Sequence, residues 1–148
     1  MALPDGTIVL LDELVTLAAH DEEVIAVLAH ELAHVEARHA LRQMIEAGTL
    51  GALVAWWVGD YGALITAAPA AILQARHSRA LEVEADARAA ERLRAAGIAP
   101  ARLADLLEKL DAAHARASKQ AQNLPTWLDY LSSHPATRDR IAALRAAD

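Results

Sequence analysis

The chain of 148 residues suits one domain with one core, and its formal net charge of −6 without a basic stripe disfavours nucleic acid as a partner. Hydrophobic residues make up 55% of the chain but aromatic residues only 3%, so the core must be aliphatic, which favours close-packed helices. Cysteine is absent, which excludes thiol chemistry and disulfides and leaves His, Asp and Glu as metal ligands.

The chain begins with a turn and a strand-like run. Pro4-Asp5-Gly6 has the composition of a turn, and Thr7–Leu11 is the best strand candidate. Residues 12–20 follow as a short helix. No secretory signal is visible, because the first residues lack a basic start and an apolar run. Since a lone strand needs partners and no other run indicates β structure, we expect a domain excised from a longer chain.

The next stretch, Glu22–Ala47, is predicted to be one helix that ends at Gly48, because its apolar residues recur three or four positions apart. Within it, His30 and His34 lie one helical turn apart, so both imidazoles can reach one metal ion. Glu31 lies beside them, where it can hold and deprotonate a metal-bound water. The same pattern also occurs in unrelated helices as solvated polar residues. A catalytic zinc site needs a third protein ligand, which must come from elsewhere in the chain.

Thr49–Ala75 is an apolar segment whose role stays open between two interpretations. A membrane-spanning helix needs about 20 apolar residues, but Gly59-Asp60-Tyr61-Gly62 and Pro69 interrupt this one, and each half is too short to span a membrane alone. We interpret the segment as a buried or interfacial helical hairpin that forms a flap near the site. An element that contacts the membrane is the alternative.

The C-terminal half is predicted to contain three further helices. A charged helix covers Arg76–Ala96 and stops at Gly97, and the next begins at Pro100. A polar connection, Lys119–Tyr130, leads to a last helix that starts at residues 133–135. The apolar side chains predicted to face inward from the last two helices are Leu103, Leu106, Leu107, Leu110, Ile141 and Leu144.

A second candidate pair lies on the charged helix. Glu82 and Asp86 are one turn apart and share a face. A glutamate there can complete a metal shell, while Asp86 can accept an N–H from a ligating imidazole and fix its orientation. A solvated acidic face is the alternative for such a pair.

Four stretches together resemble the family of integral-membrane and periplasmic zinc metallopeptidases that includes the HtpX, Oma-type and CAAX prenyl proteases. In chain order they are Leu3-Pro4-Asp5-Gly6, His30-Glu31-Leu32-Ala33-His34 with Arg38-His39, Ser78-Arg79 with residues 82–86, and Ser133-His134-Pro135 with Arg140-Ile141. The resemblance spans nearly the whole chain. It implies a mainly α fold, in which residues 1–148 form a single zincin-like helical catalytic domain with one N-terminal edge strand.

The resemblance also implies site roles. His30, His34 and Glu82 would bind one zinc ion per chain, Glu31 would be the general base, and Asp86 would orient a ligand histidine.

His134 resembles the downstream histidine that reaches over the zinc and stabilises the oxyanion. An N-cap role before Pro135 is compatible with that function. Arg38 and His39 also match family positions, and we expect structural roles for them. Three histidines have no assigned partner and are expected to be exposed: His20, His77 and His114.

The function implied is a zinc-dependent metalloendopeptidase that acts on a protein or peptide, in a bacterial-type periplasm or at the inner membrane. An extended substrate could pair with the edge of Thr7–Leu11, although an ordinary core strand is an equal interpretation. The rival functions are a catalytically degenerate zinc-binding chaperone or adaptor, and a membrane-associated structural domain. Retention of Glu31 argues against the adaptor, because zinc binding alone needs no base.

Overall fold

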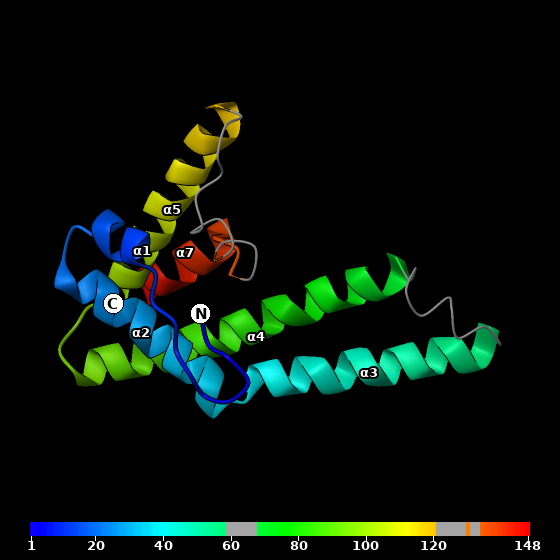
Figure 1. Cartoon of the computed structure of the whole chain (residues 1–148). Coiled ribbons are helices and arrows are strands. Elements are labelled where there is room, and N and C mark those ends of the chain that lie inside the picture. The colour runs from blue at the N-terminus through cyan, green and yellow to red at the C-terminus, as the bar shows by residue number, and fades with distance from the viewer. Residues whose placement is uncertain (59–67, 121–129, 131–133) are drawn as a thin grey trace.

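The computed structural model describes residues 1–58, 68–120, 130 and 134–148, and in them the fold is mainly helical, as predicted (Figure 1). The helices are α1 (Asp12–Leu17), α2 (Asp21–Glu36), α3 (His39–Val58), α4 (Ala68–Ala95), α5 (Ala101–Gln120) and α7 (Arg138–Ala146). Gly97 follows α4 with a φ of 72°, a left-handed conformation in which the predicted glycine stop is favourable.

The N-terminal segment folds back on itself but does not form the predicted strand over Thr7–Leu11. Within the described residues its only β pairing is an isolated antiparallel bridge between Ala2 and Ile8. Gly6 has a φ of 90° and donates its N–H to the carbonyl of Leu3 at 3.0 Å, which closes the turn. The edge strand is therefore not confirmed, since one bridge does not make a ladder.

The helix predicted over Glu22–Ala47 is divided in two. Ala37 ends α2, and Arg38 has a φ of 52°, in the left-handed region that a residue with a side chain rarely adopts. The N–H of Arg38 donates to the carbonyl of Val35 at 3.0 Å, so the turn satisfies part of the helix end. After the turn, α3 runs on through Gly48, which does not end it. Ala and Arg are strong helix formers, so nothing local in the sequence announces this break.

Helices α3 and α4 lie side by side and extend away from the other helices (Figure 1). The predicted charged helix begins earlier than expected, because Pro69 lies in the first turn of α4, where its missing N–H has no intrahelical partner. The expected bend at 59–62 lies outside the described residues. The described parts of the hairpin extend away from the body, so a flap over the site is not seen in them. Within the described residues, none of the helices combines the length and hydrophobicity needed to cross a membrane.

An aliphatic core holds the body together where α2 packs against α4 and α5, and α7 packs against the same two helices. The predicted inward face of α5 is buried, since Leu103, Leu106 and Leu110 are fully shielded from solvent. The core cluster consists of Leu14, Ala26, Val27, Ala89, Leu93, Leu103, Ala104, Leu106, Leu107, Leu110, Tyr130 and Leu144. Burial of these side chains is the main stabilising contribution to the fold.

Helix α2 is anchored at its first turn by a buried carboxylate. Glu23 accepts hydrogen bonds from Lys109 Nζ at 2.7 Å to both oxygens, and from the N–H of Ala19 at 3.1 Å. Acidic residues in this turn also suit the positive end of the helix dipole. The pairing fixes the start of α2 against α5, and with it the direction in which the two motif histidines point.

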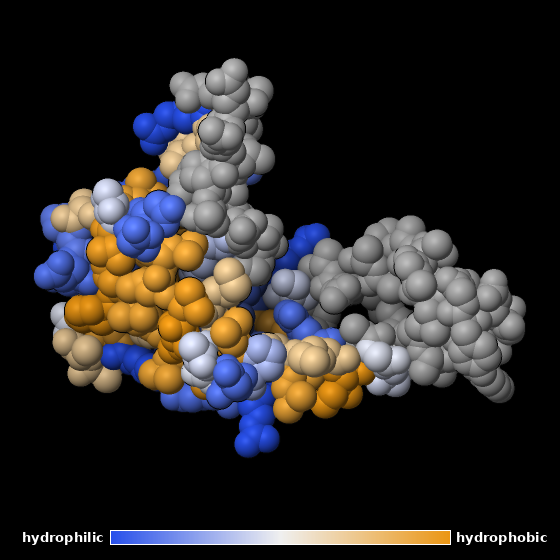
Figure 2. All heavy atoms as spheres, viewed as in Figure 1, coloured by the Kyte–Doolittle hydropathy of each residue, from blue (hydrophilic) through white to orange (hydrophobic). Residues whose placement is uncertain are grey.

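The outer face of α2 is also apolar. Figure 2 shows hydrophobic side chains gathered over α1 and α2 on one face of the molecule. Ile25, Leu28 and Leu32 recur along the helix and are 44%, 37% and 39% exposed, whereas Val27 is buried. The apolar periodicity therefore predicted helical structure here, but it did not distinguish the buried face from the exposed one.

Candidate metal centre

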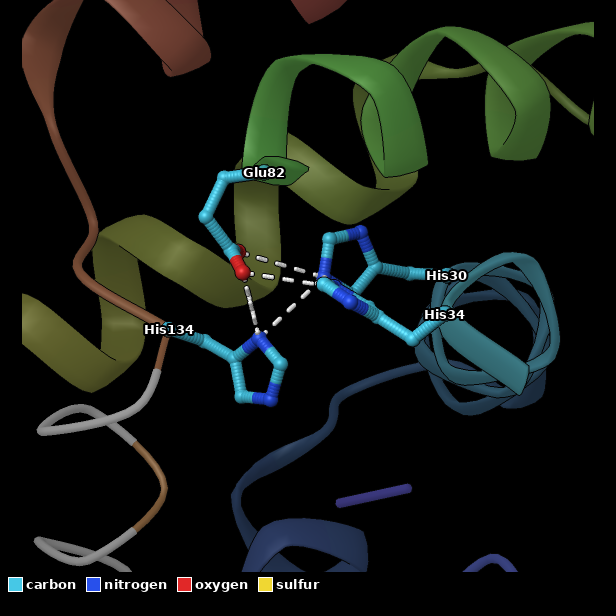
Figure 3. A group of neighbouring side chains, drawn as sticks. All are labelled: His30, His34, Glu82 and His134. Atoms are coloured by element: carbon cyan, nitrogen blue, oxygen red, sulfur yellow. Dashed lines mark hydrogen bonds and ion pairs between the residues drawn. The ribbon is translucent and has the colours of Figure 1, made fainter. Parts of the chain in front are cut away.

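Helix α2 presents His30 and His34 side by side, because residues four apart on a helix share one face (Figure 3). Their Nε2 atoms lie 3.0 Å apart. His30 is fully buried and His34 is 8% exposed. The two nitrogens therefore meet at one point inside the protein rather than in solvent, which argues against the reading of this motif as solvated polar residues.

Helix α4 brings Glu82 to the same point. Its Oε2 lies 3.3 Å from His30 Nε2, and its Oε1 lies 3.2 Å from His34 Nε2. Glu82 is only 3% exposed. The acidic pair on this helix is thus not a solvated face. Glu84, two residues on, lies outside the group of converging donor atoms.

His134 approaches the same point from the segment before α7. Its Nδ1 lies 3.1 Å from both carboxylate oxygens of Glu82 and 3.4 Å from His30 Nε2. Its backbone N–H donates to the carbonyl of Tyr130 at 2.8 Å, and the two rings stack with their centres 4.7 Å apart. The last helix begins at Arg138 rather than at residues 133–135, and its N-cap is Thr137, so His134 does not cap it.

The donor set fits a tetrahedral metal ion. One ligand atom from each of His30, His34, Glu82 and His134 lies within 4.8 Å of the others. Ligands at about 2.0–2.1 Å from a tetrahedral zinc are about 3.3–3.4 Å apart, and the donor atoms of His30, His34 and His134 lie 3.1–3.3 Å from an oxygen of Glu82, with His30 Nε2 3.0 Å from His34 Nε2 and 3.4 Å from His134 Nδ1. Imidazole nitrogens with a carboxylate are also the donors that suit zinc in a protein without cysteine.

The electrostatics of the cluster favour a positive charge at its centre. Burial lowers the pKa of His30, but hydrogen bonds and charge interactions with Asp86 and Glu82 outweigh it and raise that pKa to about 9. Burial opposes ionisation of Glu82 as well, yet contacts with His134, His30 and His34 hold its pKa well below the ordinary value. The carboxylate is therefore ionised, and the site stabilises a cation among its donors.

Asp86, one turn after Glu82, lies against the other ring nitrogen of His30. Its Oδ1 lies 2.9 Å from His30 Nδ1. The negative charge of Asp86 favours a proton on Nδ1 of His30, which would leave the lone pair of Nε2 to face the other donors.

Arg140 ties the acidic residues to the segment that carries His134. Its guanidinium donates to both oxygens of Asp86 at 2.6 and 2.8 Å, lies 2.9 Å from Glu82 Oε2, and donates to the carbonyl of Pro135 at 2.8 Å. The side chain is only 5% exposed. Arg140 belongs to one of the four stretches that carry the family resemblance, but the sequence indicates no role for it. Arg138 and Arg145 lie on the same short helix, so the sequence does not indicate which arginine is buried.

Glu31 lies beside the donor atoms and is completely buried. Its Oε1 is 3.5 Å from His134 Nε2, and its Oε2 is 3.3 Å from the amino group of Met1. Burial raises the pKa of Glu31, but the charges of His134 and of the Met1 ammonium outweigh it, so the pKa is below its ordinary value. Burial and the charges of Glu31 and Glu82 raise the pKa of the nearby Tyr130 hydroxyl well above 10. Glu31 is thus a carboxylate able to accept a proton.

A cavity of about 530 Å³ opens beside the cluster. His34, Glu82 and His134 line it together with the N-terminal residues 1–6 and the beginning of α3, including His39 and Leu41. The donor atoms are therefore reachable from a space of the size that ligand sites have.

The histidines outside the donor cluster differ in their exposure to solvent. His20 and His114 are exposed, as expected, and the side chain of His77 lies outside the described residues. His39 is 1% exposed and its Nδ1 lies 2.8 Å from His34 Nδ1, a contact that sequence analysis did not predict.

The helical fold brings three histidines and a glutamate together, with a second buried glutamate beside them, an arrangement that suits a metallopeptidase. The chain matches peptidase family M48 over residues 1–148 and belongs to that family.

Two curated relatives are both described as "Protease HtpX" and come from Legionella pneumophila, one from subspecies pneumophila strain Philadelphia 1 and one from strain Corby. Each is 32% identical over 162 residues, which cover 84% of this chain and 56% of the relative. The chain thus spans little more than half the length of these relatives. No solved structure gives a significant match.

Proposed function

We propose that the chain is the catalytic domain of a zinc-dependent endopeptidase. The observation that carries the proposal is the convergence of four donor atoms, within 4.8 Å of one another, beside the fully buried carboxylate of Glu31. Membership of peptidase family M48 supports it. Full burial of a carboxylate is costly, and a site that binds metal alone would have no need of one.

His30, His34 and Glu82 are the proposed ligands of one zinc ion per chain. When bound, zinc would acidify a water molecule and polarise the scissile carbonyl. Asp86 faces Nδ1 of His30, so that Nε2 is the nitrogen left for the metal, and Arg140 balances the charge of the two carboxylates.

Glu31 is the proposed general base. Its pKa below the ordinary value means that the carboxylate is ionised and ready to accept the proton of the attacking water. The same group would then deliver the proton to the amine of the departing peptide. The carboxylate lies next to the donor cluster rather than within it, which is the division between base and ligand that this mechanism needs.

His134 is proposed to stabilise the oxyanion. Its Nδ1 reaches the same point as the ligands but from a different segment of the chain, so a carbonyl oxygen at that point would lie within its reach. A role as a fourth ligand is the competing assignment, because the distances fit it as well. The two roles differ in what the loss of His134 does to zinc affinity.

The proposed substrate is a protein or peptide that enters the cavity between the cluster and the N-terminal segment. The name of the relatives, "Protease HtpX", supports this substrate class. Contact with a membrane through residues 49–75, at a bacterial inner membrane or in the periplasm, is proposed with it. Exposed apolar side chains at the start of α3, Met44 at 61% and Ile45 at 60%, lead into that segment.

Casein digestion with and without a chelator tests the proposal, together with a measurement of zinc content. A peptidase should bind one zinc, cleave casein, and lose both the metal and the activity in the chelator. A zinc-binding adaptor would bind the metal without cleaving casein. A protein that binds no zinc would refute the proposed site.

A further inference from the structure

The break between α2 and α3 brings His39 against the ring of His34. On one continuous helix, residues five apart point about 140° away from each other. Here Arg38 adopts a left-handed φ of 52°, and α3 starts at His39 in a new direction. The Nδ1 atoms of the two histidines lie 2.8 Å apart, and their rings meet edge to face with centres 4.8 Å apart. A backbone conformation that is costly for arginine is thus retained where it produces this contact.

The short contact fixes where the protons lie. Two ring nitrogens 2.8 Å apart must share one N–H, which one of them donates to the other. If His34 Nε2 is to bind a metal, its lone pair must face the donor cluster, so its proton is on Nδ1. His34 Nδ1–H then donates to His39 Nδ1. The proton of His39 is consequently on its Nε2.

A carboxylate faces that second nitrogen. Glu84 Oε2 lies 3.4 Å from His39 Nε2. Arg42 and Arg88 hold the same carboxylate at 3.2 and 2.8 Å. Glu84 faces this nitrogen at ion-pair distance, without a formed hydrogen bond, and its negative charge favours a proton on Nε2, which keeps Nδ1 of His39 as an acceptor. The chain of contacts runs from Glu84 through His39 to His34 and ends at the donor cluster.

We propose that His39 is a positioning residue for the metal ligand His34, and that Glu84 sets the tautomer of His39. The inference rests on the proposed zinc site. Nδ1 of His30 has a carboxylate partner in Asp86. Within the described residues Nδ1 of His34 contacts no carboxylate directly, and His39 connects it to the carboxylate of Glu84 instead. Partners of this kind change metal affinity by about 10–100-fold when they are removed.

The alternative is that His39 is only a packed core side chain, and two substitutions separate the interpretations. His39→Asn places an amide oxygen near the position of Nδ1 and keeps the acceptor while reducing the volume. His39→Phe keeps a ring of similar shape and removes the acceptor. If His39 only packs, the His39→Phe variant should bind zinc more tightly than the His39→Asn variant. If His39 positions His34 through the hydrogen bond, the order of the two zinc affinities should be reversed. Glu84→Gln and Glu84→Ala test the next contact, between Glu84 and His39, because glutamine keeps an acceptor oxygen and alanine removes it.

The experiment measures zinc affinity by competition with a chromophoric chelator, with the helix content of each variant checked by circular dichroism. We expect His39→Phe to weaken zinc binding by about 10–100-fold, and His39→Asn and Glu84→Gln to stay close to the wild type. Glu84→Ala should weaken binding by less than His39→Phe. The matched control is Glu36→Gln, which breaks the ion pair with Arg92 between the same two helices, α2 and α4, and should leave the affinity unchanged.

Nitrogen-15 NMR of the zinc-loaded protein supplies a second readout that packing does not affect. We expect His34 protonated at Nδ1 and His39 protonated at Nε2. Zinc binding by His39→Phe equal to that of the wild type, weaker binding by His39→Asn than by His39→Phe, or a proton on Nδ1 of His39 would overturn the inference. If His39→Phe fails to fold, the positioning role of His39 is tested by the zinc affinities of Glu84→Ala and Glu84→Gln and by the NMR spectrum. Failure of the wild type to bind zinc would instead refute the proposed function, and this inference with it.

Discussion

Replacing Arg140 with methionine should destabilise the fold more than any exposed ion pair would. The substitution keeps an unbranched side chain of similar length and removes the guanidinium. Two carboxylates lose their partner, Asp86 with both oxygens bound and Glu82 with one, and the carbonyl of Pro135 loses a donor. All of these groups lie where α4 meets the segment before α7, so the loss falls on the packing of the site.

The size of the effect follows from burial. Asp86 is 7% exposed, Glu82 3% and Arg140 5%. Removing one member of a buried ion pair leaves an uncompensated charge and costs about 3–5 kcal/mol. A domain's total stability is about 5–15 kcal/mol, so Arg140→Met should lower the melting temperature by about 6–20 °C. Zinc should reduce the loss, because a cation at the cluster compensates the same carboxylates.

Urea unfolding followed by circular dichroism, with and without zinc, measures this free energy. Arg145→Met is the matched control, because Arg145 lies on the same helix but is 44% exposed and binds Asp105 and Glu108 at the surface. Such pairs contribute about 0–1 kcal/mol. The reasoning is refuted if Arg140→Met costs less than about 1 kcal/mol in the zinc-free protein, or if Arg145→Met costs as much.

Three further outcomes are expected. Glu31→Gln should abolish casein cleavage while zinc content stays at one per chain, because it removes the base and keeps the ligands; loss of metal along with activity would contradict this. His134→Phe should lower the turnover number by about 10²–10³-fold at unchanged zinc affinity, and a chelator competition that shows weaker binding would instead make His134 a ligand. Leu106→Ala should lower the free energy of unfolding by about 2–5 kcal/mol, since Leu106 is fully buried; urea unfolding should show a smaller loss for the 37% exposed Leu28.

The parts of the site that follow from local geometry could be predicted from the sequence. His30 and His34 share a face on any helix, and Glu82 and Asp86 do the same on another. The aliphatic periodicity of α5 likewise placed Leu106 in the core. Each of these expectations depends on residues three or four apart, where the helix itself fixes the distance.

The features that could not be predicted depend on contacts between distant parts of the chain. Thr7–Leu11 has strand composition, but a strand exists only with a continuous partner, and the structure provides one bridge. The left-handed conformation of Arg38 has no local signal, because glycine and not arginine marks such positions. The pairing of Arg140 with Asp86 joins residues 54 positions apart. The residue type of Arg140 alone does not indicate which carboxylate it binds.

Helix α4 connects the candidate metal centre to the arm that its own first half forms with α3. The helix is continuous from Ala68 to Ala95, so its arm end lies about 21 Å from Glu82 along the axis. No glycine lies between Ala68 and Glu82, and the one proline is in the first turn, so the usual causes of a kink are missing from this stretch. Helix α3, the other half of this arm, follows α2 after the left-handed turn at Arg38. A displacement of the far end of α4 would therefore be transmitted along the helix to Glu82, and a displacement of α3 would reach His34 through its contact with His39.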